Sequence, residues 1–334
     1  MTELYPFKFE PILKTRIWGG ISLGTDFGKS IPNGVRVGES WEISGLGGDE
    51  SVVTNGFLAG NNINELIEVY MGDLTGETVY ERFGDEFPLL IKLIDTSDRL
   101  SVQVHPDDEM AARLHHAFGK TEMWYVIKAD PGSEIYCGFR KNTGDTELME
   151  ALKKQDLANI LNAEPAAAGD VFLIPAGLVH SVGPGIVLAE IQQASDVTYR
   201  IFDWNRKGED GKQRELHTEL ALEALKSDIP GGKVNLPAPE TGKTTNLVTT
   251  PSFNVNLLTF DSIIERDYNT IDSFVIFVCT SGEFIIRWEK GAESVAKGET
   301  ILIPATMGVI ILEPRPSSTL LEIYVNAGNT GNTN

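Results

Sequence analysis

The sequence predicts a mainly β fold, made of two jelly-roll β-barrels with a few peripheral helices. Short apolar segments typical of strands outnumber the amphipathic helical segments. A Pro- and Gly-rich stretch at 228–246 separates two such regions, and a related strand-and-turn motif occurs on each side of it. We therefore expect a first domain with small helical insertions at 1–230, a second barrel at 245–326, and a disordered tail at 327–334.

The expected strands are rich in Val, Ile, Leu and aromatic residues, and Gly, Pro, Asp or Asn bound them. They lie at 89–94, 99–104, 122–128, 170–174, 186–192, 253–260, 273–279, 283–288 and 300–303. Apolar residues at intervals of three and four predict fewer helices, at 62–71, 107–117, 145–161 and 215–227. Asp107, directly after a proline, is the expected N-cap of the second of these.

A weak internal repeat supports the duplication. The segment from Gly169 reads GDVFLIPA, and the segment from Gly298 reads GETILIPA. Aligning their prolines places Val309 opposite His180. Only the first barrel is therefore expected to hold a metal, and the second is expected to serve packing or an interface.

The charge of the chain excludes several classes of partner. The net charge is -20, from 28 basic and 48 acidic residues. Such a field repels nucleic acids and anionic membranes, and it would repel a phosphorylated ligand except in a local basic pocket. No segment approaches the roughly 20 apolar residues that span a bilayer, and the N-terminus does not resemble a secretory signal. Two distant cysteines, Cys137 and Cys279, predict no disulfide framework and a cytoplasmic location.

One segment predicts half of a metal site. Residues 169–180 fit the cupin pattern G-x5-P-x-G-x2-H. Gly177 permits a turn that a Cβ would obstruct, and Pro175 ends a strand. His180 then opens the next strand and can direct its imidazole into the barrel.

The other half comes from two further strands. Gln103 and His105 are two positions apart and share one face of a strand. Glu122 begins another strand, and a buried carboxylate without a cation would be costly. Two imidazoles, a carboxylate and an amide oxygen suit zinc, and three protein ligands with an open position are typical of catalytic sites. We expect His115, His116 and His217 to lie outside this site.

These residues belong to longer segments that resemble a known family. The segments are LKTRIWGG (13–20), PLLIKLIDTSDRLSVQVHPDDEMA (88–111), GKTEMWYVI (119–127), IPAGLVHSVGPG (174–185) and AEIQQASDVTYRIFDWNR (189–206). Together they resemble the short bacterial form of the type I mannose-6-phosphate isomerases, within the cupin superfamily. The resemblance implies interconversion of mannose 6-phosphate and fructose 6-phosphate with one zinc ion per chain.

The resemblance also assigns roles to individual residues. It places the zinc ligands at Gln103, His105, Glu122 and His180. It places the active-site arginine at Arg200, an active-site lysine at Lys120, an acid considered for proton transfer at Glu190, and a serine near the phosphate at Ser101. Glu190 is expected either to act as the base or to orient a zinc ligand. Longer relatives carry a helical insertion of which only 145–161 remains here, so its substrate contacts do not transfer.

Two other functions remain open. A non-catalytic cupin that binds a sugar phosphate would keep the barrel and lose the proton-transfer groups, whereas Arg200, Lys120 and Glu190 are all present. An iron-dependent cupin oxidoreductase would usually carry a His-x-His pair, whereas Gln103 occupies the first position here. The expected partner is a small hexose phosphate, and the sequence leaves the oligomeric state open.

Overall fold

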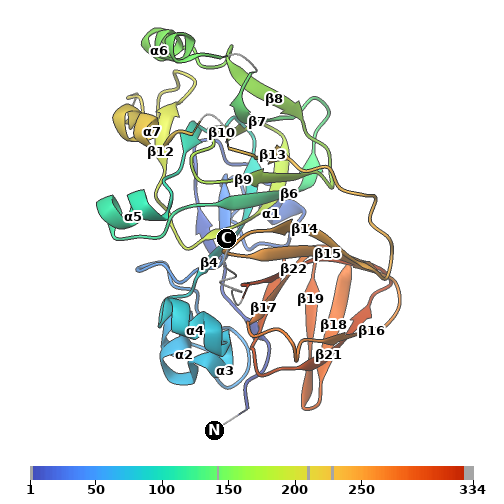
Figure 1. Cartoon of the computed structure of the whole chain (residues 1–334). Helices are drawn as coiled ribbons and strands as arrows, with labels where there is room; N and C mark the ends of the chain where they lie inside the picture. Colours follow the sequence, from blue (N-terminus) through green and yellow to red (C-terminus); the bar gives the residue numbers. More distant parts are fainter. Residues whose placement is uncertain (1–2, 141–142, 209–210, 227–228, 327–334) are drawn as a thin grey trace.

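The computed structural model describes residues 3–140, 143–208, 211–226 and 229–326. Its first half contains two facing antiparallel sheets (Figure 1). The seven-stranded sheet has the order β13 (Gly232–Lys233), β9 (Val171–Ile174), β6 (Glu122–Ala129), β11 (Ile186–Gln193), β4 (Leu89–Thr96), β3 (Glu39–Ile43), β2 (Ile12–Lys14). The five-stranded sheet has the order β12 (Tyr199–Phe202), β5 (Val102–Val104), β10 (His180–Val182), β7 (Glu134–Phe139), β8 (Leu161–Pro165).

The second half repeats this arrangement with two further antiparallel sheets. The six-stranded sheet has the order β1 (Phe7–Lys8), β20 (Thr300–Ile303), β17 (Val275–Ser281), β22 (Ser318–Tyr324), β15 (Asn254–Phe260), β14 (Thr244–Thr249). The four-stranded sheet has the order β16 (Ile264–Asp267), β21 (Val309–Pro314), β18 (Glu283–Trp288), β19 (Gly291–Ala296). The mainly β fold is thereby confirmed, with open pairs of sheets in the described residues in place of closed barrels.

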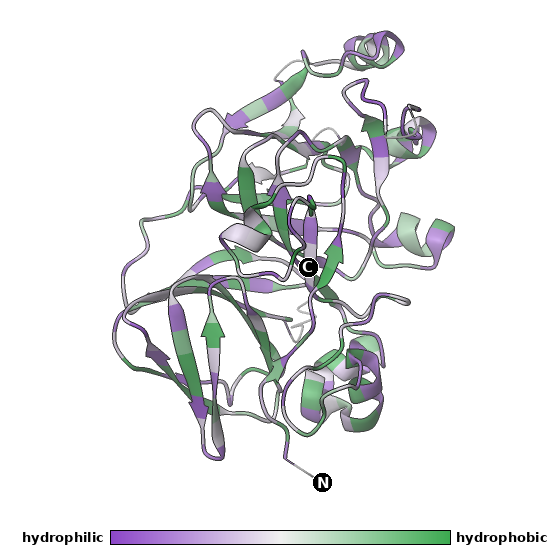
Figure 2. Ribbon diagram, turned by 180° about the vertical axis from the view of Figure 1, so that it is seen from behind, coloured by the Kyte–Doolittle hydropathy of each residue, from purple (hydrophilic) through white to green (hydrophobic). Residues whose placement is uncertain are grey.

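The two sheet pairs share an apolar layer. Every residue of β11 is buried, because both of its faces are covered. Leu188 packs inside the first sheet pair, whereas Ala189 and Ile191 belong to a cluster that also contains Ile276 and Leu321 of the second. Figure 2 shows hydrophobic residues along the strands of both sheet pairs. The near-continuous apolar strands of the sequence therefore reflect a sheet packed between two layers.

The helices lie at the periphery of the sheets (Figure 1). They are α1 (Ser22–Thr25), α2 (Ile63–Tyr70), α3 (Gly72–Thr75), α4 (Glu77–Phe83), α5 (Asp108–His115), α6 (Asp145–Lys154) and α7 (Thr218–Ala224). The predicted cap of α5 is confirmed, since the carboxylate of Asp107 accepts a hydrogen bond from the backbone N–H of Met110. None of the described helices has the length and apolar composition needed to cross a bilayer.

One helix prediction was wrong at its C-terminal end. The segment 145–161 was expected to be helical throughout, but α6 ends where Gln155 adopts a left-handed conformation (φ 51°). Leu161 already begins β8. The apolar spacing continued past the helix because Leu157, Ile160 and Leu161 pack into the cluster inside the first sheet pair.

The ends of the two predicted domains are joined by strand pairing. Phe7 of β1 pairs with Leu302 of β20, so the first strand of the chain completes a sheet of the second half. Gly232, within the Pro- and Gly-rich stretch, pairs with Leu173 of the first half. The boundaries 1–230 and 245–326 stay predictions, and the predicted disordered tail at 327–334 lies outside the described residues.

Candidate active site and metal centre

Three strands bring the predicted metal ligands together. Glu122 is the first residue of β6, and His180 is the first residue of β10. His105 directly follows β5, and Gln103 of that strand is the register partner of His180. Residues that are separated by up to 77 positions therefore meet where neighbouring strands begin or end.

The three side chains His105, Glu122 and His180 form a buried cluster. Nε2 of His105 lies 3.4 Å from Oε2 of Glu122, and Nε2 of His180 lies 3.4 Å from Oε1. One ligand atom from each of the three residues lies within 4.8 Å of the others. Both Nε2 atoms and both carboxylate oxygens are buried and have no hydrogen-bond partner in the described structure. Four unsatisfied polar atoms around one point fit a cation held by nitrogen and oxygen ligands.

The other nitrogen of each imidazole fixes its tautomer. Nδ1 of His105 lies 3.2 Å from the carbonyl oxygen of Val197, and Nδ1 of His180 lies 2.8 Å from that of Leu178. Because a carbonyl oxygen only accepts, each Nδ1 carries the proton, and each Nε2 directs a lone pair toward Glu122. This is the tautomer that a metal ligand requires.

The electrostatics of the cluster favour the same protonation states. Burial, followed by the charge of Lys120, lowers the pKa of His105 to about 3, and burial lowers the pKa of His180. Burial alone would raise the pKa of Glu122, but Lys120 and the two imidazoles hold that pKa below its usual range. Neutral imidazoles and an ionised carboxylate are the forms that bind a metal.

A cavity of ≈ 460 Å³ adjoins this cluster. It is lined by all five of the other predicted site residues: Ser101, Gln103, Lys120, Glu190 and Arg200. Lys120 joins the two regions, since its Nζ lies 3.4 Å from Oε2 of Glu122. Six basic and four acidic side chains line the cavity, so the acidic chain contains the local basic pocket that a phosphorylated ligand needs.

Glu190 is held on both of its oxygens. Oε1 accepts a hydrogen bond of 2.8 Å from Nζ of Lys92, and Oε2 accepts one of 2.8 Å from the indole N–H of Trp124. Lys92 also donates to Oε1 of Gln192 at 2.6 Å. Burial alone would lower the pKa of Lys92, but the charges of Glu190 and Glu39 raise it.

Lys92 is a cavity residue that the sequence reasoning missed. It lies in β4, where all eight residues are buried. A single lysine within the apolar run LLIKLI was the available signal, because a buried ammonium requires a partner.

Arg200 lies in β12 and is positioned by the segment that precedes α7. Its Nη1 donates to the carbonyl oxygen of Glu215 at 2.8 Å. Its backbone N–H donates to Nδ1 of His217 at 3.1 Å, and the backbone N–H of His217 donates to the carbonyl oxygen of Arg200 at 2.7 Å. His217 thus lies outside the cluster of His105, Glu122 and His180, as expected, and holds the backbone of Arg200 on both its N–H and its carbonyl.

The two remaining histidines also lie outside the metal cluster. Nε2 of His115 lies 2.6 Å from the hydroxyl oxygen of Tyr199, and His116 ends α5 in a left-handed conformation (φ 54°). The cluster contains neither of them.

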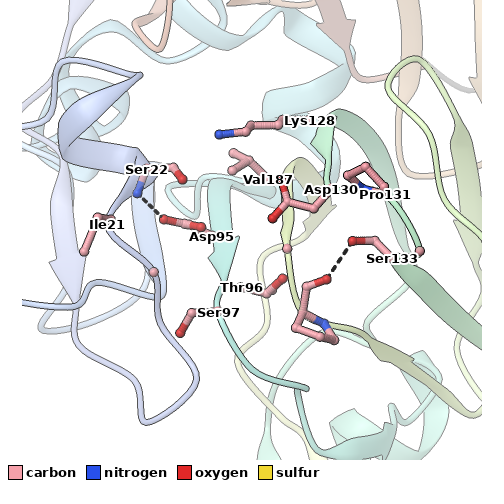
Figure 3. Close-up of a pocket in the computed structure, with 14 residues that line it drawn as sticks. Ile21, Ser22, Asp95, Thr96, Ser97, Lys128, Asp130, Pro131, Ser133 and Val187 are labelled. Carbon is pink, nitrogen blue, oxygen red and sulfur yellow. Dashed lines mark hydrogen bonds between the residues drawn. The ribbon is translucent and has the colours of Figure 1, made fainter.

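A second hollow, of ≈ 430 Å³, contains none of the predicted site residues (Figure 3). Its polar side chains are largely occupied within the protein. The carboxylate of Asp95 accepts a hydrogen bond from the backbone N–H of Ser22, and the hydroxyl of Ser133 donates to the carbonyl oxygen of Pro184 (Figure 3). Thr96 and Ser97 likewise bond to backbone carbonyls. We interpret this hollow as part of the structural framework and not as a binding site.

Comparison with known proteins agrees with the geometry. Residues 6–126 match the phosphomannose isomerase type I catalytic domain. The chain is 34% identical to a mannose-6-phosphate isomerase of Streptococcus mutans serotype c over 90% of this chain and 93% of that protein. This chain belongs to the type I phosphomannose isomerase family. A mannose-6-phosphate isomerase of Bacillus subtilis is 41% identical over 66% of this chain and 68% of its own length.

This member of the type I phosphomannose isomerase family is also similar to a solved structure over nearly its whole length. The crystal structure of a mannose 6-phosphate isomerase from Bacillus subtilis superimposes with a TM-score of 0.86 at 30% identity, covering 96% of this chain and 100% of that one. The domain match includes Gln103, His105 and Glu122, and the structural match spans the half that carries His180 and Arg200. The resemblance inferred from the sequence motifs is confirmed.

Proposed function

We propose that this protein is a zinc-dependent aldose–ketose isomerase that interconverts mannose 6-phosphate and fructose 6-phosphate through an enediol intermediate. One observation carries the proposal: the unsatisfied ligand atoms of His105, Glu122 and His180 adjoin a basic cavity large enough for a hexose phosphate. Membership of the type I phosphomannose isomerase family supports the same substrate pair.

The donor set favours zinc among the common divalent metals. His105, Glu122 and His180 would hold the ion, and the amide oxygen of Gln103 would complete the set from the neighbouring strand. When bound, zinc supplies a Lewis acid that stabilises negative charge on the sugar oxygens.

The cavity residues divide into those that bind and those that position. Arg200 offers a planar set of donors for phosphate or for an enediolate oxygen, and Ser101 and Lys120 offer further donors beside it. Lys120 is also close enough to Glu122 to assist proton transfer beside the metal centre. Both carboxylate oxygens of Glu190 already accept hydrogen bonds, and one of them holds the Lys92 ammonium in the cavity wall. We therefore assign Glu190 a positioning role and not that of the catalytic base.

The location is proposed from the cysteines. Cys137 and Cys279 are both buried and unbridged. Burial raises the pKa of each thiol, which disfavours oxidation. We propose that the protein works in the reducing cytoplasm.

A coupled assay tests the activity. The protein purified with zinc is given mannose 6-phosphate, and formation of fructose 6-phosphate is followed before and after treatment with a chelator. We expect turnover, its loss on chelation, and its recovery with zinc. Undiminished turnover after exhaustive metal removal would contradict the metal role, and binding of mannose 6-phosphate without turnover would favour the non-catalytic cupin.

The intermediate requires a separate experiment. An enediol forms when a proton leaves C2 of the open-chain aldose and the carbonyl oxygen O1 gains a proton. It becomes the ketose when a proton is delivered to C1 and the hydroxyl on C2 loses its proton. In deuterated water, part of the product should therefore carry deuterium at C1. Complete transfer of the C2 label to C1 would show no exchange with solvent, which is the result expected of direct hydride transfer.

A further inference from the structure

Arg200 has donors that the described protein does not use. Its Nη1 bonds to the carbonyl oxygen of Glu215, whereas its Nε is buried without a hydrogen-bond partner. Burial, followed by the charge of Arg214, lowers the pKa of Arg200. A half-buried guanidinium beside a second one is unfavourable unless an anion binds between them.

Arg214 supplies that second guanidinium on the same cavity wall. Its Nε donates to Oδ2 of Asp203 at 2.7 Å, and its Nη2 donates to Oδ1. These bonds fix the plane of the guanidinium and leave Nη1 for a further acceptor. The segment around Arg214 also contains Glu215 and His217, which hold Arg200.

Among the described residues, no carboxylate forms an ion pair with Arg200, although the charges of Asp203 and Glu215 act on it. Asp203 is shared between Arg214 and Arg206, and Asp98 pairs with Arg206. Arg200 is therefore the guanidinium of this group that has no carboxylate of its own among the described residues.

At another part of the lining, each cation has its own acid. Lys14 pairs with Asp49, and Arg16 forms two hydrogen bonds to the carboxylate of Glu39. The lack of an ion-pair partner for Arg200 among the described residues thus distinguishes its end of the cavity.

We propose that Arg214 forms, together with Arg200, the subsite for the phosphate group of the substrate. Two fixed guanidinium groups match the geometry and charge of a phosphate dianion. Asp203 is a positioning residue in this subsite, since it holds Arg214 in place. The assignment rests on the proposed function for the identity of the sugar, but the subsite itself is defined by its affinity for phosphate.

Inorganic phosphate is the probe that tests the subsite, by titration calorimetry on the zinc-loaded protein. Arg214→Gln should weaken phosphate binding about tenfold or more, the effect of losing one charge-assisted hydrogen bond. The KM for mannose 6-phosphate should rise in parallel, with kcat and zinc content little changed. Arg206→Gln is the matched control, because Arg206 shares Asp203 and does not line the cavity, so phosphate affinity should stay within about twofold of the parent.

Phosphate affinity equal to that of the parent in Arg214→Gln would overturn the assignment. If that variant does not fold, Arg214→Lys keeps the charge beside Asp203 and removes the planar fork. Weaker phosphate binding then supports the assignment, and parent-like binding overturns it. A parent protein that binds phosphate through Arg214 but does not isomerise mannose 6-phosphate would refute the proposed function alone.

Discussion

Nζ of Lys92 lies 2.8 Å from Oε1 of Glu190, and both side chains are buried in the wall of the same cavity. They come from neighbouring strands, β4 and β11, at directly paired positions. The pair holds the ammonium group of Lys92 in the cavity wall and keeps it out of contact with bulk solvent.

Breaking this pair should destabilise the fold. Glu190→Gln removes the carboxylate that forms an ion pair with the buried Lys92 ammonium, and breaking a buried pair in this way typically costs about 3–5 kcal/mol of unfolding free energy. The double variant Lys92→Met/Glu190→Gln should be more stable than the sum of the two single effects predicts. Urea denaturation of all four proteins measures this, and strictly additive effects would show that the pair is not coupled.

The metal should be lost with one imidazole. His180→Ala is expected to remove zinc, as measured by elemental analysis, because it takes away one of three clustered ligands. His116→Asn is the control, since His116 lies outside the cluster and Asn tolerates its left-handed conformation. The parent should bind one zinc per chain, and undiminished zinc in His180→Ala would refute the ligand assignment.

Arg200 should affect turnover rather than metal content. Arg200→Ala is expected to retain zinc and to lose kcat/KM for mannose 6-phosphate by about two orders of magnitude or more, the range for removal of one stabilising donor. Arg200→Lys should recover only part of the rate, because the ammonium lacks the planar fork. Near-normal kcat/KM in Arg200→Ala would remove the arginine from the mechanism.

The metal-free protein should become less stable in acid. The pKa of His105 is about 3 in the folded protein and near 6.5 when unfolded, so the unfolded chain binds its proton first as pH falls. This contribution is present above pH 6.5 and is lost progressively as the pH falls from there to about 3. Thermal melting at several pH values should show that the stability of metal-free His105→Gln depends less on pH than that of the metal-free parent. An identical pH dependence would show that His105 does not make this contribution.

A residue of the second half caps a helix of the first. The carboxylate of Asp272 accepts hydrogen bonds from the backbone N–H groups of Glu77 and Thr78, at 2.7 and 2.9 Å, at the start of α4. Asp272→Ala should cost about 0.5–2 kcal/mol of unfolding free energy and leave kcat unchanged. Asp272→Asn should retain most of the stability, and equal stability of the alanine variant would show that the cap contributes nothing.

The metal cluster could be predicted from sequence because its determinants are local. The parity of Gln103 and His105 along a strand, and the turn that precedes His180, fix the direction of each side chain without knowledge of the partner strands. The resemblance then supplied Arg200, Lys120, Glu190 and Ser101, and the cavity contains all of them.

The contacts that sequence analysis missed join residues that are far apart in the sequence. The partnership of Lys92 with Glu190 follows from the register of β4 against β11, and Arg214 reaches the cavity because Asp203 holds it. The end of α6 was also missed. The apolar spacing continues beyond Gln155, where the helix ends in a left-handed conformation, because the later apolar residues pack from a turn and a strand instead.

The pairing of β1 with β20 has a consequence for how the protein is made. Phe7 leaves the ribosome long before its partner Leu302 has been translated, because the two residues are far apart in the sequence. The nascent chain must therefore hold an unpaired strand β1, and the exposed faces of β4 and β11, until the strands of the second half have been translated. Release of a chain truncated after residue 230 would leave that apolar surface uncovered, and such a fragment should aggregate or be degraded.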